Sequence, residues 1–322
     1  MRRSATATTA AALAALLFLA GCSGDGGDAD PAGTPTEAAT DASGEPTEAA
    51  TGEPTGNAAE DVAALESITV EGEPGAAPTL TFEQPLNVGG QAAVLASPGD
   101  GETLEEGQLL VVNFVQVNGE NGEVLDSTYE TDGQPLVISD QVTVPALNDV
   151  LIGQQVGARV LFASPTQAAA AIMAIEVLDA RTRAEGEPVE LPEGLPTVTL
   201  AENGEPSIEP VDGDAPTELV TATTIRGEGK EVEAGDYVHV QYSGWLWDGT
   251  AFDSSWSRGV PFPLEVGAGQ VIEGWDTGLL GQTVGSQVLL VIPPELGYGD
   301  QDNGTIPPGS TLVFVVDILH AA

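Results

Sequence analysis

Hydrophobic and polar positions alternate over several short stretches of the chain, as is typical of β-strands. Residues 237–242 alternate apolar and polar side chains, and residues 288–292 form a continuous apolar run rich in branched residues. Between these stretches, Ile272, Trp275 and Leu279 are spaced for one face of a short helix. Many antiparallel strands with one short helix predict an α+β domain, in which a curved sheet wraps over the helix.

The pattern occurs twice. Residues 99–102 (GDGE) recur 128 residues later as 227–230 (GEGK), and at the same offset the sequence LIGQQVG recurs as LLGQTVG. The repeat predicts two tandem domains, residues 62–183 and residues 195–322, the second with an N-terminal extension. The proline- and glutamate-rich residues 184–194 are expected to form the linker between them.

The N-terminal part differs in composition from the repeats. Arg2 and Arg3 precede an apolar run too short to span a bilayer stably, and the run ends in Leu-Ala-Gly before Cys22, the only cysteine. This resembles a bacterial lipobox, which implies that residues 1–21 are a signal peptide and that Cys22 carries a lipid anchor to the membrane. A plain secretory signal followed by an unmodified cysteine is the alternative. With one cysteine, the chain forms no internal disulfide.

Residues 22–61 are rich in Gly, Pro, Thr, Ala and acidic residues. A segment of this composition buries too little apolar surface to offset the entropy lost on ordering. We therefore expect a disordered acidic tether, which would place the two domains outside the cytoplasm, anchored to the cell membrane.

The chain is strongly acidic, with a formal net charge of −42. No basic patch is present to neutralise phosphates, so nucleic acid is excluded as a partner, and the same charge excludes electrostatic docking to anionic lipid. We interpret the charge as a source of solubility for an exported protein.

The sequence contains no catalytic motif with a nucleophile and no cluster with metal-ligand spacing. His239 and His320, the two histidines, lie on predicted strands without a serine or cysteine motif beside them. No glycine-rich phosphate loop precedes a helix, so neither a metal nor a cofactor is expected. The notable feature is residues 242–259, which hold five of the fifteen aromatic side chains. Their concentration around a few polar groups indicates a small apolar pocket.

A series of short motifs in residues 227–320 is similar in order and spacing to the FKBP-type peptidyl-prolyl cis-trans isomerases. The motifs are YSG (242–244), DGTAFDSS (248–255), VIEGW (271–275), IPP (292–294), GYG (297–299), IPP (306–308) and TLVF (311–314). The resemblance implies a domain in which a curved antiparallel sheet wraps over a short α-helix, and an activity that accelerates rotation about X–Pro bonds. It also implies proline-containing polypeptides as substrates and macrolides of the rapamycin type as inhibitors.

Carried over by position, the resemblance implies that Trp275 is the floor of a proline pocket. Tyr298 and the backbone N–H of Ile272 would donate hydrogen bonds to substrate carbonyls, and Asp253, with Arg258 as its partner, would lie at the pocket edge. Ile306 would close the side of the flap. The implied walls are Tyr242, Phe252, Phe262, Val271, Ile272 and Phe314. Taken singly, each residue also has a structural explanation, such as core packing or a turn; their order favours the pocket. Trp245, Trp247 and Trp256 match no pocket position.

The first copy keeps the framework and loses the pocket. Phe114 stands for Tyr242, Leu125 for Phe252, Leu136 for Phe262 and Leu147 for Trp275, and the loop that carries Tyr298 is missing. We therefore predict a catalytically silent domain that serves as a spacer, a dimer surface or a substrate-holding module.

Two functions follow from these observations. The first is a lipid-anchored isomerase that assists the folding of exported proteins, through desolvation and stabilisation of a twisted amide in the aromatic pocket. The alternative is a non-catalytic, chaperone-like lipoprotein that binds peptides without turnover. A solute-binding or adhesive lipoprotein would need a larger cavity or a sandwich pattern, and neither is visible in the sequence.

Overall fold

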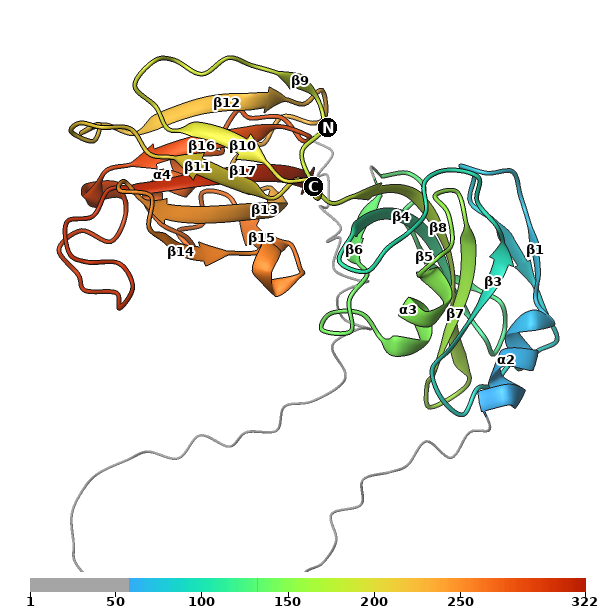
Figure 1. Cartoon of the computed structure of the whole chain (residues 1–322). Helices are drawn as coiled ribbons and strands as arrows, with labels where there is room; N and C mark the ends of the chain where they lie inside the picture. The colour runs from blue at the N-terminus through green and yellow to red at the C-terminus, as the bar shows by residue number, and fades with distance from the viewer. Residues whose placement is uncertain (1–57, 132) are drawn as a thin grey trace, which may run out of the picture.

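The computed structural model describes residues 58–131 and 133–322, which form two antiparallel sheets that lie side by side (Figure 1). We call residues 58–181 the first unit and residues 184–322 the second unit. The predicted signal peptide, Cys22 and nearly all of the predicted tether lie outside the described residues. Within the described part, no helix is long and apolar enough to cross a membrane.

The first unit is a six-stranded sheet with strands in the order β3-β7-β8-β4-β5, in which β6 also pairs with β4. A separate hairpin, β1-β2, lies beside it. The elements are α2 (Ala58–Glu66), β1 (Thr69–Glu71), β2 (Thr79–Thr81), β3 (Ala92–Ser97), β4 (Leu109–Asn118), β5 (Val124–Ser127), β6 (Gln134–Val137), α3 (Pro145–Leu151), β7 (Arg159–Pro165) and β8 (Ala170–Arg181).

The second unit is a seven-stranded sheet in the order β14-β13-β17-β16-β12-β9, in which β15 also pairs with β13. A hairpin, β10-β11, accompanies it. The elements are β9 (Glu187–Pro188), β10 (Thr197–Leu200), β11 (Pro206–Glu209), β12 (Val220–Arg226), β13 (Tyr237–Leu246), β14 (Ala251–Ser254), η1 (Trp256–Arg258), β15 (Phe262–Glu265), α4 (Glu273–Gly278), β16 (Gln287–Ile292), η2 (Pro294–Leu296) and β17 (Leu312–Ala321).

The two sheets share one strand order once β9 is set aside, because β3, β7, β8, β4 and β5 correspond to β12, β16, β17, β13 and β14. The repeated glycines make the same contact in both units. A Cβ at Gly99 would lie 2.2 Å from the Val156 carbonyl oxygen, and one at Gly227 would lie 2.3 Å from that of Val284. Both positions therefore require glycine, which explains why this motif is present in both copies.

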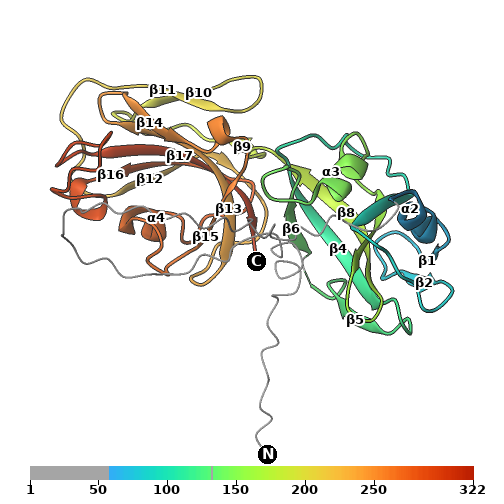
Figure 2. The same ribbon diagram turned by 90° about the horizontal axis from the view of Figure 1, so that it is seen from below.

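In the second unit the core lies between the sheet and α4. This helix has only 6 residues, too few for stability in isolation, so it depends on burying Trp275 and Leu279. Gly274 and Gly278 let it approach β16: a Cβ at Gly274 would lie 2.4 Å from the Ile292 side chain. The sheet wraps over α4 (Figure 2), which confirms the predicted α+β class for this domain.

The boundary expected at residue 61 between tether and folded domain is wrong, because α2 begins at Ala58. The Asp61 side chain is buried, and its carboxylate accepts hydrogen bonds from the N–H groups of Gly89 and Gly90 at 2.7 and 2.9 Å. Asp61 therefore ties the helix to the loop before β3. The expected tether overlaps the folded part by residues 58–61.

Residues 184–194 were expected to be a free linker, but the start of this segment is bound to the second unit. The Ala184 N–H donates to the Asp317 carboxylate at 2.8 Å, and the Glu185 N–H donates to the Gly285 carbonyl at 3.0 Å. Strand β9 then pairs with β12. Backbone hydrogen bonds therefore hold this segment in place. Its proline-rich composition gave no sign of them.

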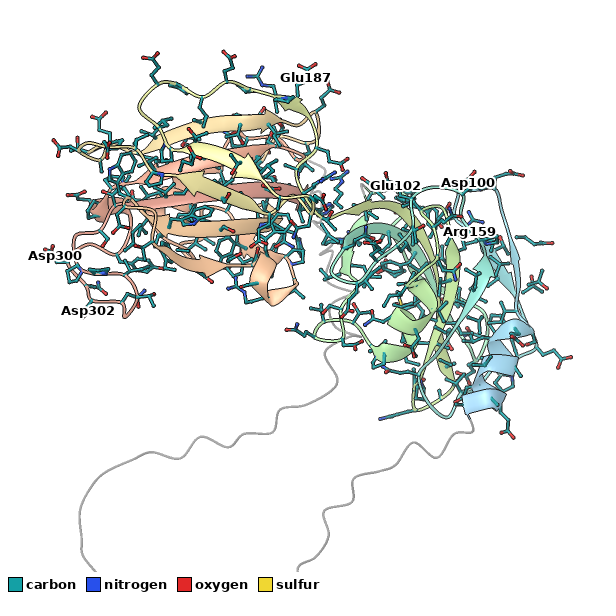
Figure 3. The ribbon with its side chains drawn as sticks, viewed as in Figure 1. Asp100, Glu102, Arg159, Glu187, Asp300 and Asp302 are labelled. Carbon is teal, nitrogen blue, oxygen red and sulfur yellow. The ribbon has the colours of Figure 1, made fainter. Side chains whose placement is uncertain are left out.

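Each sheet also has an outer face that is covered. In the first unit, Arg159 on β7 (Figure 3) forms a buried ion pair with Glu176, 3.0 Å long. Arg159 also donates hydrogen bonds to the carbonyls of Gly72 and Glu73, which fixes the turn of the β1-β2 hairpin. In the second unit, Trp245 and Trp247 pack on the outer face with side chains from residues 191–208. Neither tryptophan faces α4, in agreement with their exclusion from the predicted pocket.

Candidate active site

A cavity of about 370 Å³ opens at the concave side of the second sheet. Nine of the eleven predicted pocket residues line it, together with Gln270, which the sequence did not indicate. The lining residues are Tyr242, Phe252, Asp253, Phe262, Gln270, Val271, Ile272, Trp275, Tyr298 and Phe314. They come from six different parts of the second unit, so only the fold brings them together.

The aromatic rings contact one another edge to face. Trp275 is 4% exposed and lies at the centre, with its ring centroid 5.0 Å from that of Tyr242, 5.2 Å from Phe314 and 6.3 Å from Phe262. Phe252 in turn contacts Phe314 at 5.4 Å. Such perpendicular pairs are favourable beyond their buried area, so the walls are mutually fixed before any ligand enters.

A hydrogen-bonded group of three side chains forms the polar edge of the cavity. The Tyr242 hydroxyl donates to the Asp253 carboxylate, and Arg258 donates to that carboxylate at 2.5 Å and to the Tyr242 hydroxyl oxygen at 2.8 Å. The guanidinium carbon lies 5.4 Å from the centroid of the Tyr242 ring. Arg258 does not line the cavity itself; it holds Asp253 and Tyr242 from outside, as the partner role predicts.

These contacts set the charge states at the edge. Burial raises the pKa of Tyr242 to about 12, and its hydrogen bond to Asp253 adds to the effect. Burial also acts to raise the pKa of Asp253, but hydrogen bonds from Tyr242 and Arg258 and the charge of Arg258 outweigh it and hold the pKa below its ordinary value. At neutral pH the edge is therefore a carboxylate, a guanidinium and a neutral phenol.

Two hydrogen-bond donors lie at the cavity without a partner for their N–H or O–H in the described chain. The N–H of Ile272, at the N-cap of α4, makes no hydrogen bond to described residues, and neither does the Tyr298 hydroxyl. The loop that carries Tyr298 is tied by the Gly299 N–H to the Pro294 carbonyl at 2.8 Å. Both groups are therefore available to donate a hydrogen bond to a bound molecule.

Gln270 enters the cavity lining from a glycine-containing loop. The Asp276 carboxylate accepts hydrogen bonds from the N–H groups of Gly267 and Gly269, at 2.9 and 3.0 Å. These bonds fasten the loop to α4 and so place Gln270 beside Val271. Nothing in the sequence distinguishes this glutamine from an ordinary loop residue, and only the loop geometry reveals it.

Ile306, like Arg258, was predicted at the pocket and does not line the cavity. Its side chain is 4% exposed and belongs to the same buried cluster as Trp275, Leu312 and Phe314. Ile306 belongs to the loop between β16 and β17, and its side chain packs into the core. It anchors this loop and does not form a surface for a ligand.

The first unit has no equivalent cavity lining at the corresponding positions. Phe114 is buried in the place of Tyr242 and Leu147 in the place of Trp275, while Leu125 is 53% exposed. One expected equivalence is wrong. Val112 pairs with Gln134 as Val240 pairs with Phe262, so Gln134 and not Leu136 stands in the place of Phe262. Leu136 instead corresponds to the core residue Leu264, which faces Val238.

The loop that carries Tyr298 also lacks a counterpart. Strands β7 and β8 are joined by residues 166–169 alone, where the second unit has residues 293–311 between β16 and β17. Among residues 58–131 and 133–322, no group of three or more His, Cys, Asp or Glu side chains is placed to hold a metal ion.

Residues 228–319 match the family described as FKBP-type peptidyl-prolyl cis-trans isomerase. The chain is 42% identical over 117 residues to the FK506-binding protein of Streptomyces anulatus, covering 35% of this chain and 94% of that protein. It is 46% identical over 116 residues to the peptidyl-prolyl cis-trans isomerase FKBP2 of Bos taurus, covering 31% and 83%.

A further relative is FK506-binding protein 2 of Gibberella zeae, 50% identical over 91 residues, which cover 28% of this chain and 47% of that protein. The chain thus spans less than half the length of this relative. The chain belongs to the FKBP-type peptidyl-prolyl cis-trans isomerase family, and the matched region is the second unit, which contains the cavity.

Proposed function

We propose that the second unit accelerates cis–trans isomerisation of X–Pro bonds and that the 370 Å³ cavity receives the proline ring. The observation that carries this proposal is that nine of the eleven residues implied by the resemblance line one aromatic cavity. Aromatic walls fit the flat, apolar faces of a pyrrolidine ring, and the donors of Ile272 and Tyr298 lie where substrate carbonyls would enter.

The chemistry needs no acid, base or cofactor. An X–Pro bond isomerises through a twisted amide, across a barrier of about 20 kcal/mol and with time constants of roughly 10–100 s without a catalyst. Twisting breaks the amide resonance, so the carbonyl is less dipolar in the transition state than in the planar ground state. A cavity that excludes water solvates the planar form less well than water does, which lowers the barrier.

In this mechanism the polar edge serves to hold the walls. Because Asp253 and Arg258 both bind the Tyr242 hydroxyl, the Tyr242 ring cannot rotate away from Trp275. The donors act on the substrate: Ile272 and Tyr298 would fix the carbonyls on the two sides of the bond while it twists. The twisted geometry is therefore selected by fixed groups and needs no proton transfer.

The test is a proline-isomerisation assay of the full chain on X–Pro peptides with varied X. Trp275→Ala and Tyr298→Phe should each lower the rate, whereas Trp247→Ala, on the outer face, should leave it unchanged. Unchanged rates for both cavity variants would exclude the mechanism. Peptide binding that a rapamycin-type inhibitor displaces, without any acceleration of isomerisation, would support the alternative of a peptide-binding, chaperone-like protein.

We also propose that the first unit is a second FKBP-like domain without catalytic activity. Its strand order matches that of the second unit, and it has Leu147 and Gln134 in the places of Trp275 and Phe262. In the full chain, Trp275→Ala combined with Tyr298→Phe should therefore lower the rate, and the first unit should not make up the loss. A wild-type rate in this double variant would assign turnover to the first unit.

For localisation, we propose a lipoprotein anchored through Cys22 on the outer side of the cell membrane, acting on exported proteins. This proposal is supported by the sequence of residues 1–22, with its basic start, apolar run and single cysteine. Cell fractionation with Cys22→Ala tests it: the variant should leave the membrane fraction, and retention there would contradict lipid anchoring.

A further inference from the structure

The two units meet at the segment that connects two parts of the proline cavity. Residues 258–260 begin with Arg258, which holds Asp253 and Tyr242, and lead to Phe262, which is a cavity wall. On their other side these residues contact the first unit. The Gln141 side chain donates from Nε2 to the Arg258 carbonyl at 3.3 Å.

Two further contacts lie beside this hydrogen bond. A Cβ at Gly107 would lie 3.1 Å from the Gly259 carbonyl oxygen, so the two backbones approach closely. Val260 packs against Leu109 and Val137 of the first unit and Leu319 of the second, and these three are at most 7% exposed. The junction therefore has an apolar centre with a hydrogen bond at its edge.

Within its own unit, the Arg258 side chain anchors the segment to Asp253 and Tyr242, but its backbone makes few hydrogen bonds. Ser257, Arg258 and Gly259 are exposed, and their backbone is held by the single turn η1, through the Arg258 N–H to Ser255 and the Gly259 N–H to Trp256. Gly259 has a φ of 71°, and a Cβ there would meet nothing. A short exposed turn of this kind opens at low cost unless another part of the chain contacts it.

The connection between the units is short and held at both ends. Arg181, the last residue of β8, donates to the Leu319 carbonyl on β17 at 2.7 Å and is itself fixed by Asp179. Ala184 is already bonded to Asp317. Only two residues, 182 and 183, separate these anchor points, so the first unit cannot swing far from the 258–260 segment.

We propose that the first unit is a positioning element for the proline cavity, in which Gln141, Gly107 and the cluster of Leu109, Val137, Val260 and Leu319 hold the segment between Arg258 and Phe262. This inference rests on the proposed isomerase function of the second unit. The first unit then contributes to catalysis indirectly. It does not touch the substrate, but it positions Phe262, the cavity wall that does. Gln141 and Arg181 are accordingly positioning residues.

The experiment compares two double variants of the full chain with the same change in composition. In Gln141→Glu with Arg181→Gln, a carboxylate faces the Arg258 carbonyl and the bond to Leu319 is lost. In Gln155→Glu with Arg226→Gln, the changes affect the Gly101 carbonyl and an exposed arginine at the end of β12, outside the connection at residues 182 and 183. Both double variants alter the net charge by the same amount, so a difference between them reports on the position of the change.

For the junction variant we expect kcat/KM on an X–Pro peptide to fall by about five-fold or more, because small displacements of positioning groups are costly. Backbone hydrogen exchange should also become faster in residues 256–262, with thermal unfolding close to that of the wild type. The control variant should match the wild type in all three measurements. Unchanged kcat/KM and unchanged exchange in the junction variant would overturn the inference.

The two proposals fail separately. A wild-type chain that does not accelerate isomerisation removes the proposed function. The hydrogen-exchange comparison still decides whether the first unit holds the 258–260 segment. An active wild type with identical exchange and identical kcat/KM in both double variants retains the isomerase and removes the positioning role.

Discussion

At the scale of single residues, the aromatic side chains fall into two groups with different tasks. Tyr242 and Trp275 line the cavity on the inner face of the second sheet, whereas Trp245 and Trp247 cover its outer face. Tyr242 and Trp245 lie on the same strand, three positions apart, and successive side chains on a strand point to opposite faces. Their positions in the alternating pattern therefore decide which ring can meet a substrate.

The first unit suggests a substitution that should separate folding from binding. Leu147 occupies the place of Trp275 and is 2% exposed, so the framework accepts a leucine there. We expect Trp275→Leu to destabilise the chain by about 1–3 kcal/mol and to lower kcat/KM by about ten-fold or more, because apolar contact with the proline ring is lost. Thermal unfolding and the isomerisation assay measure the two effects. Trp245→Leu, the outer-face control, should lose stability only, and a similar activity loss there would contradict the assignment.

Asp317 makes stability depend on pH. Burial raises the pKa of Asp317 to about 6, although the Ala184 N–H, Gln287 and the charge of Arg183 act against it. The folded state then binds more protons than the unfolded state between pH 4 and pH 6, so the contribution of this group to stability falls as the pH rises through that range. We expect the stability of Asp317→Asn relative to the wild type, measured by denaturant unfolding, to increase as the pH rises from 4 to 7. A difference between the two that stays constant with pH would show that Asp317 is charged throughout.

At the scale of elements, the loop between β16 and β17 carries most of what distinguishes the two units. Strands β7 and β8 close with residues 166–169, so the sheet itself does not need a long connection. We expect a chain in which residues 293–311 are replaced by the sequence of residues 166–169 to fold and to be inactive. Burial of Ile306 would be lost, at a cost of roughly 1.5–3 kcal/mol.

Circular dichroism and thermal unfolding test whether the loop replacement folds. The isomerisation assay tests whether it is inactive. The control is Asn203→Asp at the tip of the β10-β11 hairpin, which keeps a tight turn as Asp-Gly; it should retain activity. Retained isomerisation in the loop replacement would mean that Tyr298 contributes nothing.

Some of the helices and strands could be predicted from the sequence, and others could not. The central strands and α4 follow from alternation and helical spacing, because each buries one regular face. Strand β9 and the first turn of α2 have no such period: they are fixed by contacts with distant residues, such as Asp61 with Gly89 and Gly90. The misplaced equivalence of Leu136 and Phe262 has a related cause. The connections before β6 and β15 differ in length, and only the pairing of Val112 with Gln134 reveals the register.

At the scale of the whole molecule, contacts between the units were beyond the reach of the sequence. Leu109, Val137 and Leu319 look like core residues of their own strands, and their buried positions agree with that reading. Their contact with Val260 depends on the angle at which the connection at residues 182 and 183 leaves β8. Periodicity describes one element against its neighbours, so it carries no signal for the packing of one sheet unit on another.

The charge of the molecule leads to a prediction about substrates. With a net charge of −42, the chain should attract cationic peptides over distances set by the Debye length, roughly 30 Å at 0.01 M salt and 3 Å at 1 M. Asp300 and Asp302 are exposed on the loop that carries Tyr298, at the end of the second unit away from the first (Figure 3). We expect kcat/KM at low salt to be about ten-fold higher for Lys-Pro than for Glu-Pro peptides.

Salt separates this attraction from intrinsic differences between the peptides. The Lys-Pro rate should fall as salt rises, the Glu-Pro rate should rise, and an Ala-Pro peptide should change little, because only the charged peptides experience the field of the protein. Asp300→Asn with Asp302→Asn should reduce the difference more than Glu120→Gln with Glu123→Gln on the β4-β5 turn, because field strength falls with distance from the cavity. Equal salt dependence for all three peptides would mean that the acidic surface serves solubility alone and does not select substrates.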